Sequence, residues 1–129
     1  MKYLLTVVIP TYNRADILST TLSFVIPQVL EHKDEVHIYI SDNASTDNTK
    51  ENVEKIMKQY PDLITYFCQE KNLTASPNFN DAVHRVNSEY VYLLSDDDII
   101  VPECISFMLK CIKENREVKY FYINPNRSL

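Results

Sequence analysis

Short apolar runs and amphipathic stretches alternate along the chain. The run YLLTVVIP at residues 3–10 is continuously apolar and rich in β-branched residues, which is typical of a strand buried on both faces. Residues 15–31 carry apolar side chains three and four positions apart, which predicts a helix that Pro27 ends or kinks. The same two patterns predict strands at residues 3–10, 35–41, 62–69, 89–95 and 117–124. They predict helices at residues 15–31, 47–60, 77–87 and 102–115.

This alternation predicts an α/β fold with a mainly parallel sheet and helices on both faces. In such sheets, ligands bind beyond the carboxyl ends of the strands. Polar segments follow each of the first four predicted strands, at residues 10–14, 41–43, 69–72 and 95–98. We therefore expect any ligand site to lie at the sheet edge where these segments meet.

Composition narrows the possible classes of protein. The 129 residues fit a single domain or part of one, and 45% hydrophobic with 24% charged residues is typical of a globular core. The net charge of −5 argues against general nucleic-acid binding, which requires a basic surface. No run of 18 apolar residues predicts a transmembrane segment, and we interpret the N-terminal run as a first strand rather than a signal peptide.

Cysteine and glycine usage exclude several kinds of site. The odd, widely spaced set of Cys68, Cys104 and Cys111 indicates neither a disulfide framework nor a cysteine zinc site. We predict that these cysteines are buried free thiols in a reducing cytoplasm. The sequence contains no glycine, so it has neither a dinucleotide-binding GxGxxG loop nor a Walker loop. A bound nucleotide would need another way to hold its phosphates.

Three adjacent aspartates, Asp96, Asp97 and Asp98, follow the fourth predicted strand. Mg²⁺ and Mn²⁺ prefer carboxylate oxygen, and Mg²⁺ is usually held by one or two carboxylates together with substrate phosphates. A metal here could bridge to a diphosphate without a glycine loop. The alternative is a helix-capping or solvated acidic turn. If Pro102 begins the next helix, however, Val101 is its cap, and capping explains none of the three aspartates well.

Four other polar or aromatic side chains near strand ends have two interpretations each. Asp42 could accept a hydrogen bond from a base or a ribose, or it could form an Asx turn within SDNAST. Tyr12 could stack on a base, although ordinary packing is common in a chain with nine tyrosines. Lys71 and Arg14 could meet phosphate or base oxygens, or they could be solvated charges.

Four ordered segments together resemble family 2 glycosyltransferases of the GT-A fold. They are VVIPTYNR (7–14), ISDNASTDNT (40–49), NLTASPNFNDAV (72–83) and YVYLLSDDDIIVP (90–102). The resemblance implies the Rossmann-like nucleotide-binding half of an inverting, metal-dependent enzyme with a Mn²⁺ or Mg²⁺ cofactor. Its implied donor is a UDP- or dTDP-type sugar, and its implied acceptor is a glycan or a lipid-linked hydroxyl in cell-surface polysaccharide synthesis.

The resemblance also implies roles for individual residues. Counted back from Pro102, Asp97 falls at the family's metal-binding aspartate, Asp96 at a ribose-contacting position and Asp98 at a frequent third acidic position. Asp42 matches the acidic residue that meets the base. The nucleotide-binding set is therefore Pro10, Thr11, Tyr12, Asp42, Lys71 and Asp96, and the metal-binding set is Asp97 and Asp98.

The chain departs from the family pattern in two loops and one helix. Family members commonly have glycine where this chain has residues 44–45 and 73–74. The segment NFNDAV stands where Ala-Arg-Asn is frequent, which leaves Asn78 and Asn80 as candidate substitutes for a contact to the donor phosphate or sugar.

The family's general base lies in the second half of its domain, and no carboxylate here matches it. We therefore expect residues 1–129 to be the nucleotide-sugar-binding half of a truncated or incomplete product whose acceptor half is missing. The expected location is cytoplasmic, peripheral to the inner membrane for the full-length protein. A sheet edge exposed by truncation would favour self-association.

Two other functional classes fit parts of the sequence. A binding module without turnover would keep the nucleotide site and lack the base. A receiver domain of the flavodoxin-like type also has acidic strand ends, but it would need an aspartate after its third strand, where this chain has Gln69-Glu70-Lys71.

Overall fold

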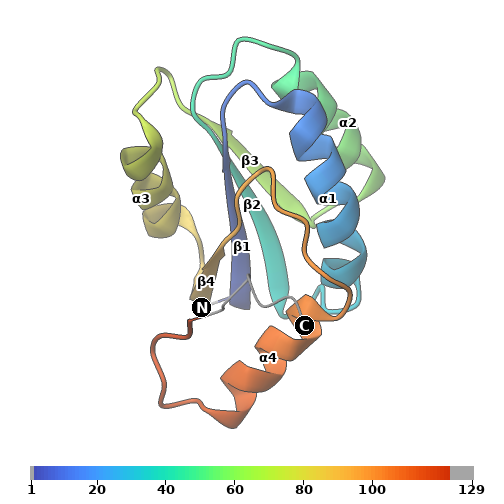
Figure 1. Ribbon diagram of the computed structural model, residues 1–129, viewed down its shortest axis with the longest axis vertical. Helices are drawn as coiled ribbons and strands as arrows, with labels where there is room; N and C mark the ends of the chain where they lie inside the picture. Colours follow the sequence, from blue (N-terminus) through green and yellow to red (C-terminus); the bar gives the residue numbers. More distant parts are fainter. Residues whose placement is uncertain (1, 123–129) are drawn as a thin grey trace.

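The computed structural model describes residues 2–122, which form one α/β layer structure (Figure 1). Four parallel strands make a sheet in the order β3-β2-β1-β4. The strands are β1 (Tyr3–Thr11), β2 (Val36–Asp42), β3 (Ile64–Cys68) and β4 (Ser88–Leu93). The helices are α1 (Ala15–Leu30), α2 (Thr49–Gln59), α3 (Ala75–Arg85) and α4 (Cys104–Glu114). The predicted parallel α/β sheet is confirmed.

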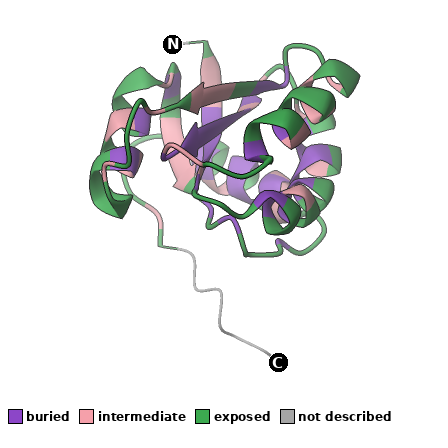
Figure 2. Cartoon of the chain, turned by 90° about the horizontal axis from the view of Figure 1, so that it is seen from above, coloured by how far each residue is buried: buried purple, intermediate pink, exposed green. Residues whose placement is uncertain are grey.

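Helices cover both faces of the sheet, as the sequence predicts. Successive side chains of a strand point to opposite faces, so Val7 and Ile9 pack into the larger core while Val8 packs into the smaller one. The larger core also contains buried residues of α1, α2 and α4, and the smaller contains Ala82 of α3. Figure 1 shows α3 on the opposite side of the sheet from α1 and α2. In Figure 2 the buried positions line the inner surfaces of these layers.

The strand order creates a switch point between β1 and β4. The chain moves outward from β1 through β2 to β3, and it then returns to the other side of β1 as β4. In open sheets of this kind, ligands bind at the carboxyl ends of the strands beside such a reversal. The switch point brings the end of β1, at Thr11, close to the aspartates that follow β4.

The predicted fifth strand at residues 117–124 is wrong for its described part. Residues 117–122 are irregular, and residues 123–124 lie outside the described residues. The segment contacts β4 through side chains instead of a ladder. The Tyr90 hydroxyl donates to the Val118 carbonyl, and the Tyr90 ring centroid lies 5.9 Å from that of Phe121. Aromatic and β-branched residues favour a half-buried surface in general, and here Val118 and Phe121 are partly buried without strand pairing, while Tyr120 and Tyr122 are exposed.

The start of α4 also differs from the prediction. The helix begins at Cys104, so Pro102 is not its first residue and Val101 is not its cap. Gln28 of α1 supplies the hydrogen bonds that a local cap residue would otherwise make at the start of α4. Its side-chain oxygen accepts from the Ile105 N–H at 3.0 Å, and its nitrogen donates to the Val101 carbonyl at 2.9 Å. The cap comes from a distant helix, which local sequence does not reveal.

Two further local predictions need correction. Cys68 is exposed and Cys104 and Cys111 are only partly buried, so the cysteines are free as predicted but not buried. Helix α1 continues through Pro27 to Leu30, so this proline does not end the helix. Among residues 2–122, none of the helices is long and apolar enough to cross a membrane.

Without glycine, the chain uses other residues where the backbone turns left-handed. Positive φ angles occur at Asn13 (50°), Ala44 (69°), Asp62 (66°), Thr74 (70°) and Glu103 (68°). Thr74 combines φ 70° with ψ 173°, a region that is essentially restricted to glycine. Ala44 and Thr74 lie in the two loops where the resembling family commonly has glycine. The structure therefore keeps the backbone shape of those loops without the residue that favours it.

Thr74→Gly is expected to raise the free energy of unfolding by about 1 kcal/mol, because relief of about 1–3 kcal/mol of strain exceeds the added entropy of the unfolded chain. The backbone hydrogen bonds of Thr74 to Asn72 and Asn43 need no side chain. Urea denaturation measures the change. The control is Ser76→Gly inside α3, which should lower stability. A lower stability for Thr74→Gly would contradict the argument.

Candidate functional site

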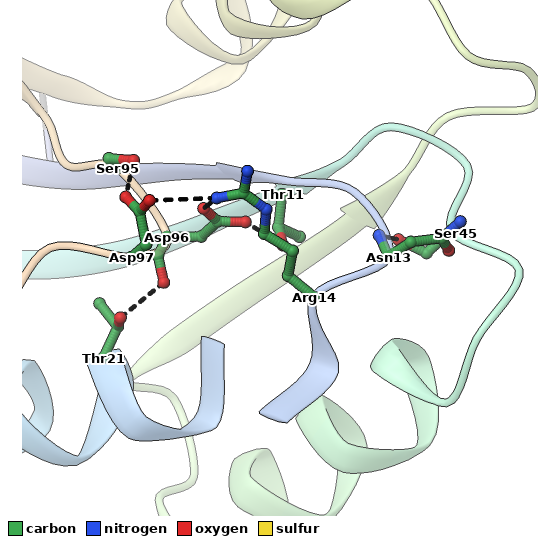
Figure 3. Close-up of polar contacts among 8 residues, drawn as sticks. All are labelled: Thr11, Asn13, Arg14, Thr21, Ser45, Ser95, Asp96 and Asp97. Carbon is green, nitrogen blue, oxygen red and sulfur yellow. Dashed lines mark hydrogen bonds and ion pairs between the residues drawn. The ribbon is translucent and has the colours of Figure 1, made fainter. Parts of the chain in front are cut away.

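Asp96 is fixed at the switch point by β1, which contacts its side chain, and by α1, which contacts its backbone carbonyl (Figure 3). Thr11 Oγ1 donates to Asp96 Oδ2 at 2.8 Å, and Thr21 Oγ1 donates to the Asp96 carbonyl at 2.6 Å. Asp96 is only 6% exposed. A buried carboxylate is costly unless it is paired and hydrogen-bonded, so these contacts explain how the chain keeps Asp96 at this place.

Arg14 joins Asp96 to Asp97. Its Nη1 lies 3.1 Å from Asp96 Oδ1 and 3.2 Å from Asp97 Oδ2 (Figure 3). Asp97 is exposed, and Ser95 Oγ donates to its Oδ1 at 2.6 Å. The hydrogen bond from Ser95, and then the charge of Arg14, hold the pKa of Asp97 below its usual value. Two carboxylates therefore converge on one cation beside the end of β1.

Asp98 is placed differently from its two neighbours. It is exposed, and its backbone N–H donates to the Ser95 carbonyl at 3.2 Å, which closes a turn. Its side chain does not share the hydrogen bonds that link Asp96 and Asp97 within the described residues. The structure thus separates the triplet into a buried carboxylate, an exposed one paired with Arg14, and a third at the turn.

Asp42 is fully buried at the end of β2, and the protein already occupies both of its oxygens. Its Oδ1 accepts from the Ser45 backbone N–H at 2.9 Å and from Ser45 Oγ at 2.6 Å. Its Oδ2 accepts from the Tyr66 hydroxyl at 2.5 Å. Burial, and then this contact with Asp42, raise the pKa of Tyr66, so the tyrosine stays a neutral donor. The local-turn interpretation of Asp42 is therefore present in the structure, and a base contact would have to share these oxygens.

Asn43 holds the loop after β3 beside the loop after β2. Its Oδ1 accepts from the Leu73 N–H at 2.8 Å, and its Nδ2 donates to the Thr74 carbonyl at 3.0 Å. Lys71 lies exposed in the same loop. Sequence reasoning did not identify Asn43, although its place directly after Asp42 at a strand end was a usable signal. It brings Lys71 to the same edge of the sheet as the aspartates.

The loop after β1 is tied to the loop after β2 by Asn13. Its Oδ1 accepts from the Thr46 N–H at 2.7 Å, and its backbone N–H donates to Ser45 Oγ at 2.8 Å. Tyr12, just before it, is 44% exposed, so part of this residue is open to solvent and the rest is covered by the protein. Pro10 is partly buried on β1. Tyr12 thus presents an aromatic surface beside a fixed loop.

Asp47 caps two helices at once. One carboxylate oxygen accepts from the Thr49 N–H at 3.0 Å, and the other accepts from the Ala15 N–H at 3.2 Å. These residues begin α2 and α1. Desolvation raises the pKa of Asp47, but the hydrogen bonds from Thr49 and Ala15 together lower it. The negative charge of Asp47 interacts favourably with the N-termini of α1 and α2, and it thereby fixes both helices next to the loops that precede them.

Asn78 is turned toward β2 rather than toward the open edge. It is 1% exposed, its Oδ1 accepts from Ser41 Oγ at 2.8 Å, and its Nδ2 donates to the Ser41 carbonyl at 2.9 Å. Asn80 is exposed. The polar atoms of Asn78 are thus already used to support β2, which leaves Asn80 as the more accessible of the two candidate substitutes.

The carboxylates fit a hard divalent ion that a substrate helps to bind. Within residues 2–122, no group of three or more His, Cys, Asp or Glu side chains is arranged to hold a metal by itself. Asp96 and Asp97 offer oxygen donors around one point, which a guanidinium nitrogen occupies here. Two carboxylates completed by phosphate and water are a common site for Mg²⁺. The donor set fits Mg²⁺ or Mn²⁺ in an open site.

Comparison with known proteins adds three findings. The family model described as Glycosyl transferase family 2 matches residues 6–127. The abequosyltransferase RfbV of Salmonella typhimurium is 33% identical over 100 residues, which are 78% of this chain and 30% of that protein. Residues 1–349 of S. aureus TarS, solved in complex with UDP-GlcNAc, superpose with a TM-score of 0.75 at 26% identity, over 88% of this chain and 32% of that solved chain.

A mannosyltransferase of Pyrobaculum calidifontis, solved with GDP-Man and Mn²⁺, has the same fold. Its TM-score is 0.77 at 23% identity, over 87% of this chain and 33% of that one. The chain therefore spans about a third of the length of RfbV and of these two solved chains.

Proposed function

Because the chain belongs to glycosyl transferase family 2, we propose that the protein transfers a sugar from a nucleotide-diphosphate donor to an acceptor hydroxyl. The observation that carries this proposal is the convergence of Asp96 and Asp97 at the switch point between β1 and β4. Nucleotides bind at such reversals in related open sheets. The residues described here would form the donor side, and the proposed activity belongs to the longer protein.

Within this site we propose one group of residues for the nucleotide and one for the metal. Tyr12 offers an exposed ring for base stacking, and the exposed Lys71 offers a charge for phosphate. Thr11 acts on the ribose side through Asp96, since its hydroxyl is already donated to that carboxylate. The proposed nucleotide-binding set is Pro10, Thr11, Tyr12, Asp42, Lys71 and Asp96, and the proposed metal-binding set is Asp97 and Asp98.

The proposed metal is Mn²⁺ or Mg²⁺, supported by the Mn²⁺ in the mannosyltransferase neighbour. When bound, such an ion would neutralise charge that develops on the leaving diphosphate. Asp97 would hold it from an exposed position, and Thr11 would keep Asp96 oriented beside it. Transfer with inversion also needs a base to deprotonate the acceptor, and we assign that role to no carboxylate of this chain.

The proposed donor is a UDP- or dTDP-sugar, and the proposed acceptor is a glycan or lipid-linked hydroxyl in polysaccharide synthesis. UDP-GlcNAc bound to TarS supports the uridine nucleotide, and the abequosyltransferase relative supports transfer of a sugar. A cytoplasmic position next to the membrane fits these substrates. Self-association through a sheet edge stays a prediction. Of the two edge strands of the described sheet, β3 and β4, the latter ends at Leu93, which is 50% exposed.

Calorimetric titration of the 129-residue chain with UDP and dTDP tests the proposal. We expect affinity for one of them to fall about tenfold or more when EDTA replaces Mn²⁺, since loss of a metal–phosphate interaction worth about 1.4 kcal/mol is already a tenfold change. GDP is the comparison nucleotide. Circular dichroism with EDTA confirms that the chain stays folded. Binding of equal strength with and without Mn²⁺ would remove the metal from the proposal.

A binding module without turnover is the second candidate, favoured by the absence of glycine at residues 44–45 and 73–74, where the family commonly has it. It would show the same nucleotide binding. Incubation of the chain with UDP-GlcNAc or dTDP-linked sugars, followed by chromatography of the released nucleotide, separates the two. Release above the enzyme-free rate would contradict the module.

A further inference from the structure

Arg14 occupies the point where the carboxylates of Asp96 and of the proposed metal ligand Asp97 converge. It directly precedes α1, and a single nitrogen, Nη1, lies 3.1 Å from Asp96 Oδ1 and 3.2 Å from Asp97 Oδ2. Figure 3 shows the guanidinium extending from the end of β1 toward both carboxylates. A cation of the protein itself therefore stands between the two acidic side chains.

Both carboxylate oxygens of Asp96 already accept a hydrogen bond. Thr11 uses Oδ2 and Arg14 uses Oδ1, and the residue is 6% exposed. At Asp97, Ser95 uses Oδ1 and Arg14 uses Oδ2. A divalent ion that binds Asp97 must therefore take an oxygen that already accepts a hydrogen bond, and Arg14 also holds one oxygen of the neighbouring Asp96.

The two ion pairs of Arg14 differ in strength. The side chain of Asp96 is 8% exposed and that of Asp97 is 51% exposed, while that of Arg14 is 47% exposed. Pairs between exposed groups are weak, whereas a buried carboxylate that loses its partner is strongly destabilised. Displacement of Arg14 from Asp97 therefore costs less than displacement from Asp96.

We propose that Arg14 is an internal counter-ion of the Asp96–Asp97 pair and that a divalent cation displaces its guanidinium from Asp97. The inference rests on the proposed metal site, and it goes further by giving Arg14 a role in setting the metal affinity. In the metal-free protein Arg14 offsets the repulsion between the two carboxylates. It also makes metal binding weaker than the carboxylates alone would allow, because the ion and the guanidinium compete for the same oxygens.

Titration with Mn²⁺ alone tests this competition, with the electron paramagnetic resonance signal of free Mn²⁺ as the measure of binding. We expect Arg14→Gln to bind Mn²⁺ about two- to fivefold tighter than the wild type, the range that corresponds to an exposed ion pair. Arg14→Lys keeps the charge as a compact, strongly hydrated ammonium, so its affinity should lie between the two. Circular dichroism shows whether each variant is folded.

The matched control is Arg85→Gln, which removes an equal charge from a pair with Asp81 on α3. Its Mn²⁺ affinity should equal that of the wild type. If the wild type binds Mn²⁺ and Arg14→Gln binds it equally or more weakly, the inference is overturned and the proposed metal site stands. If neither protein binds Mn²⁺, the metal site itself has failed, and the inference fails with it.

A second measurement follows Arg14 directly. Phenylglyoxal modifies accessible guanidinium groups, and mass spectrometry gives the extent for each arginine. Saturating Mg²⁺ should increase modification of Arg14 and leave that of Arg85 unchanged. An unchanged or reduced extent at Arg14 would mean that the ion does not displace it.

Discussion

Asp97→Asn is expected to weaken Mn²⁺ binding by at least about 10- to 100-fold. Substitution of a residue that only hydrogen-bonds to a metal ligand already costs this much affinity, and loss of a ligand itself should cost no less. Asp97 is the exposed member of the carboxylate pair, so it is the oxygen donor that an incoming ion reaches first. The amide keeps the size of the side chain but removes its charge. Mn²⁺-dependent UDP binding, measured by calorimetry, should fall with it.

The fold should tolerate this change, because Asp97 is exposed and its ion pair with Arg14 is of the weak surface kind. Asp34→Asn is the matched control. It alters the net charge equally, and Asp34 lies exposed in the turn before β2, at the opposite end of the strands. Asp98→Asn tests the second proposed ligand by itself, and we expect it to weaken Mn²⁺ binding less than Asp97→Asn does. Wild-type Mn²⁺ affinity in Asp97→Asn would exclude this residue as a ligand.

Asn78→Ala is expected to lower the free energy of unfolding by about 1–3 kcal/mol, because the buried Ser41 carbonyl loses the donor that Asn78 Nδ2 provides, while the Ser41 hydroxyl keeps the backbone carbonyl of residue 78 at 3.3 Å as an acceptor. Both the hydroxyl and the carbonyl of Ser41 bond to the Asn78 amide, and Ser41 is fully buried. The loss would loosen the attachment of α3 to β2 directly beside Asp42. Urea denaturation monitored by circular dichroism measures it.

Asn80→Ala serves as the control for Asn78→Ala. Asn80 lies on the same helix but is exposed, and its recorded contact with His84 uses the backbone carbonyl. Its stability should stay within about 0.5 kcal/mol of the wild type, as for most surface substitutions. Equal stabilities of the two variants would show that the Ser41–Asn78 contact does not support the fold.

The sequence predicted the sheet and the edge that carries the site, because both depend on strong local patterns. Continuous apolar runs identified the four strands, and parallel pairing then determines that Thr11, Asp42 and Asp96 lie at the same edge. The acidic triplet indicated a metal site because it follows a buried strand. The local pattern could not show that the three aspartates differ in burial and in pairing. Those differences depend on contacts with Thr11 and Arg14, which lie far from the aspartates in the sequence.

The predictions that failed depend on contacts between distant elements. Helix α4 starts later than Pro102 suggests because Gln28 on α1 caps it. Residues 117–122 have the composition of a strand, but the Tyr90 side chain bonds to the segment where a ladder was expected. The sequence did not predict a role for Asn43, because that residue acts by holding together two loops that are 30 residues apart in the sequence. In each case a side chain from one element completes the backbone of another.

The pairing of β1 with β4 has a consequence for the order of folding. Thr11 and Asp96 are separated by 85 residues in the sequence, and β4 is the last strand of the described sheet to be synthesised. Contacts of such long range form slowly, because the intervening chain must first lose the entropy of closing a large loop. The β1–β2 pair can form during synthesis, whereas the acidic centre exists only after the final strand has docked. We therefore expect a partly folded chain to form most of its sheet before the acidic centre is complete.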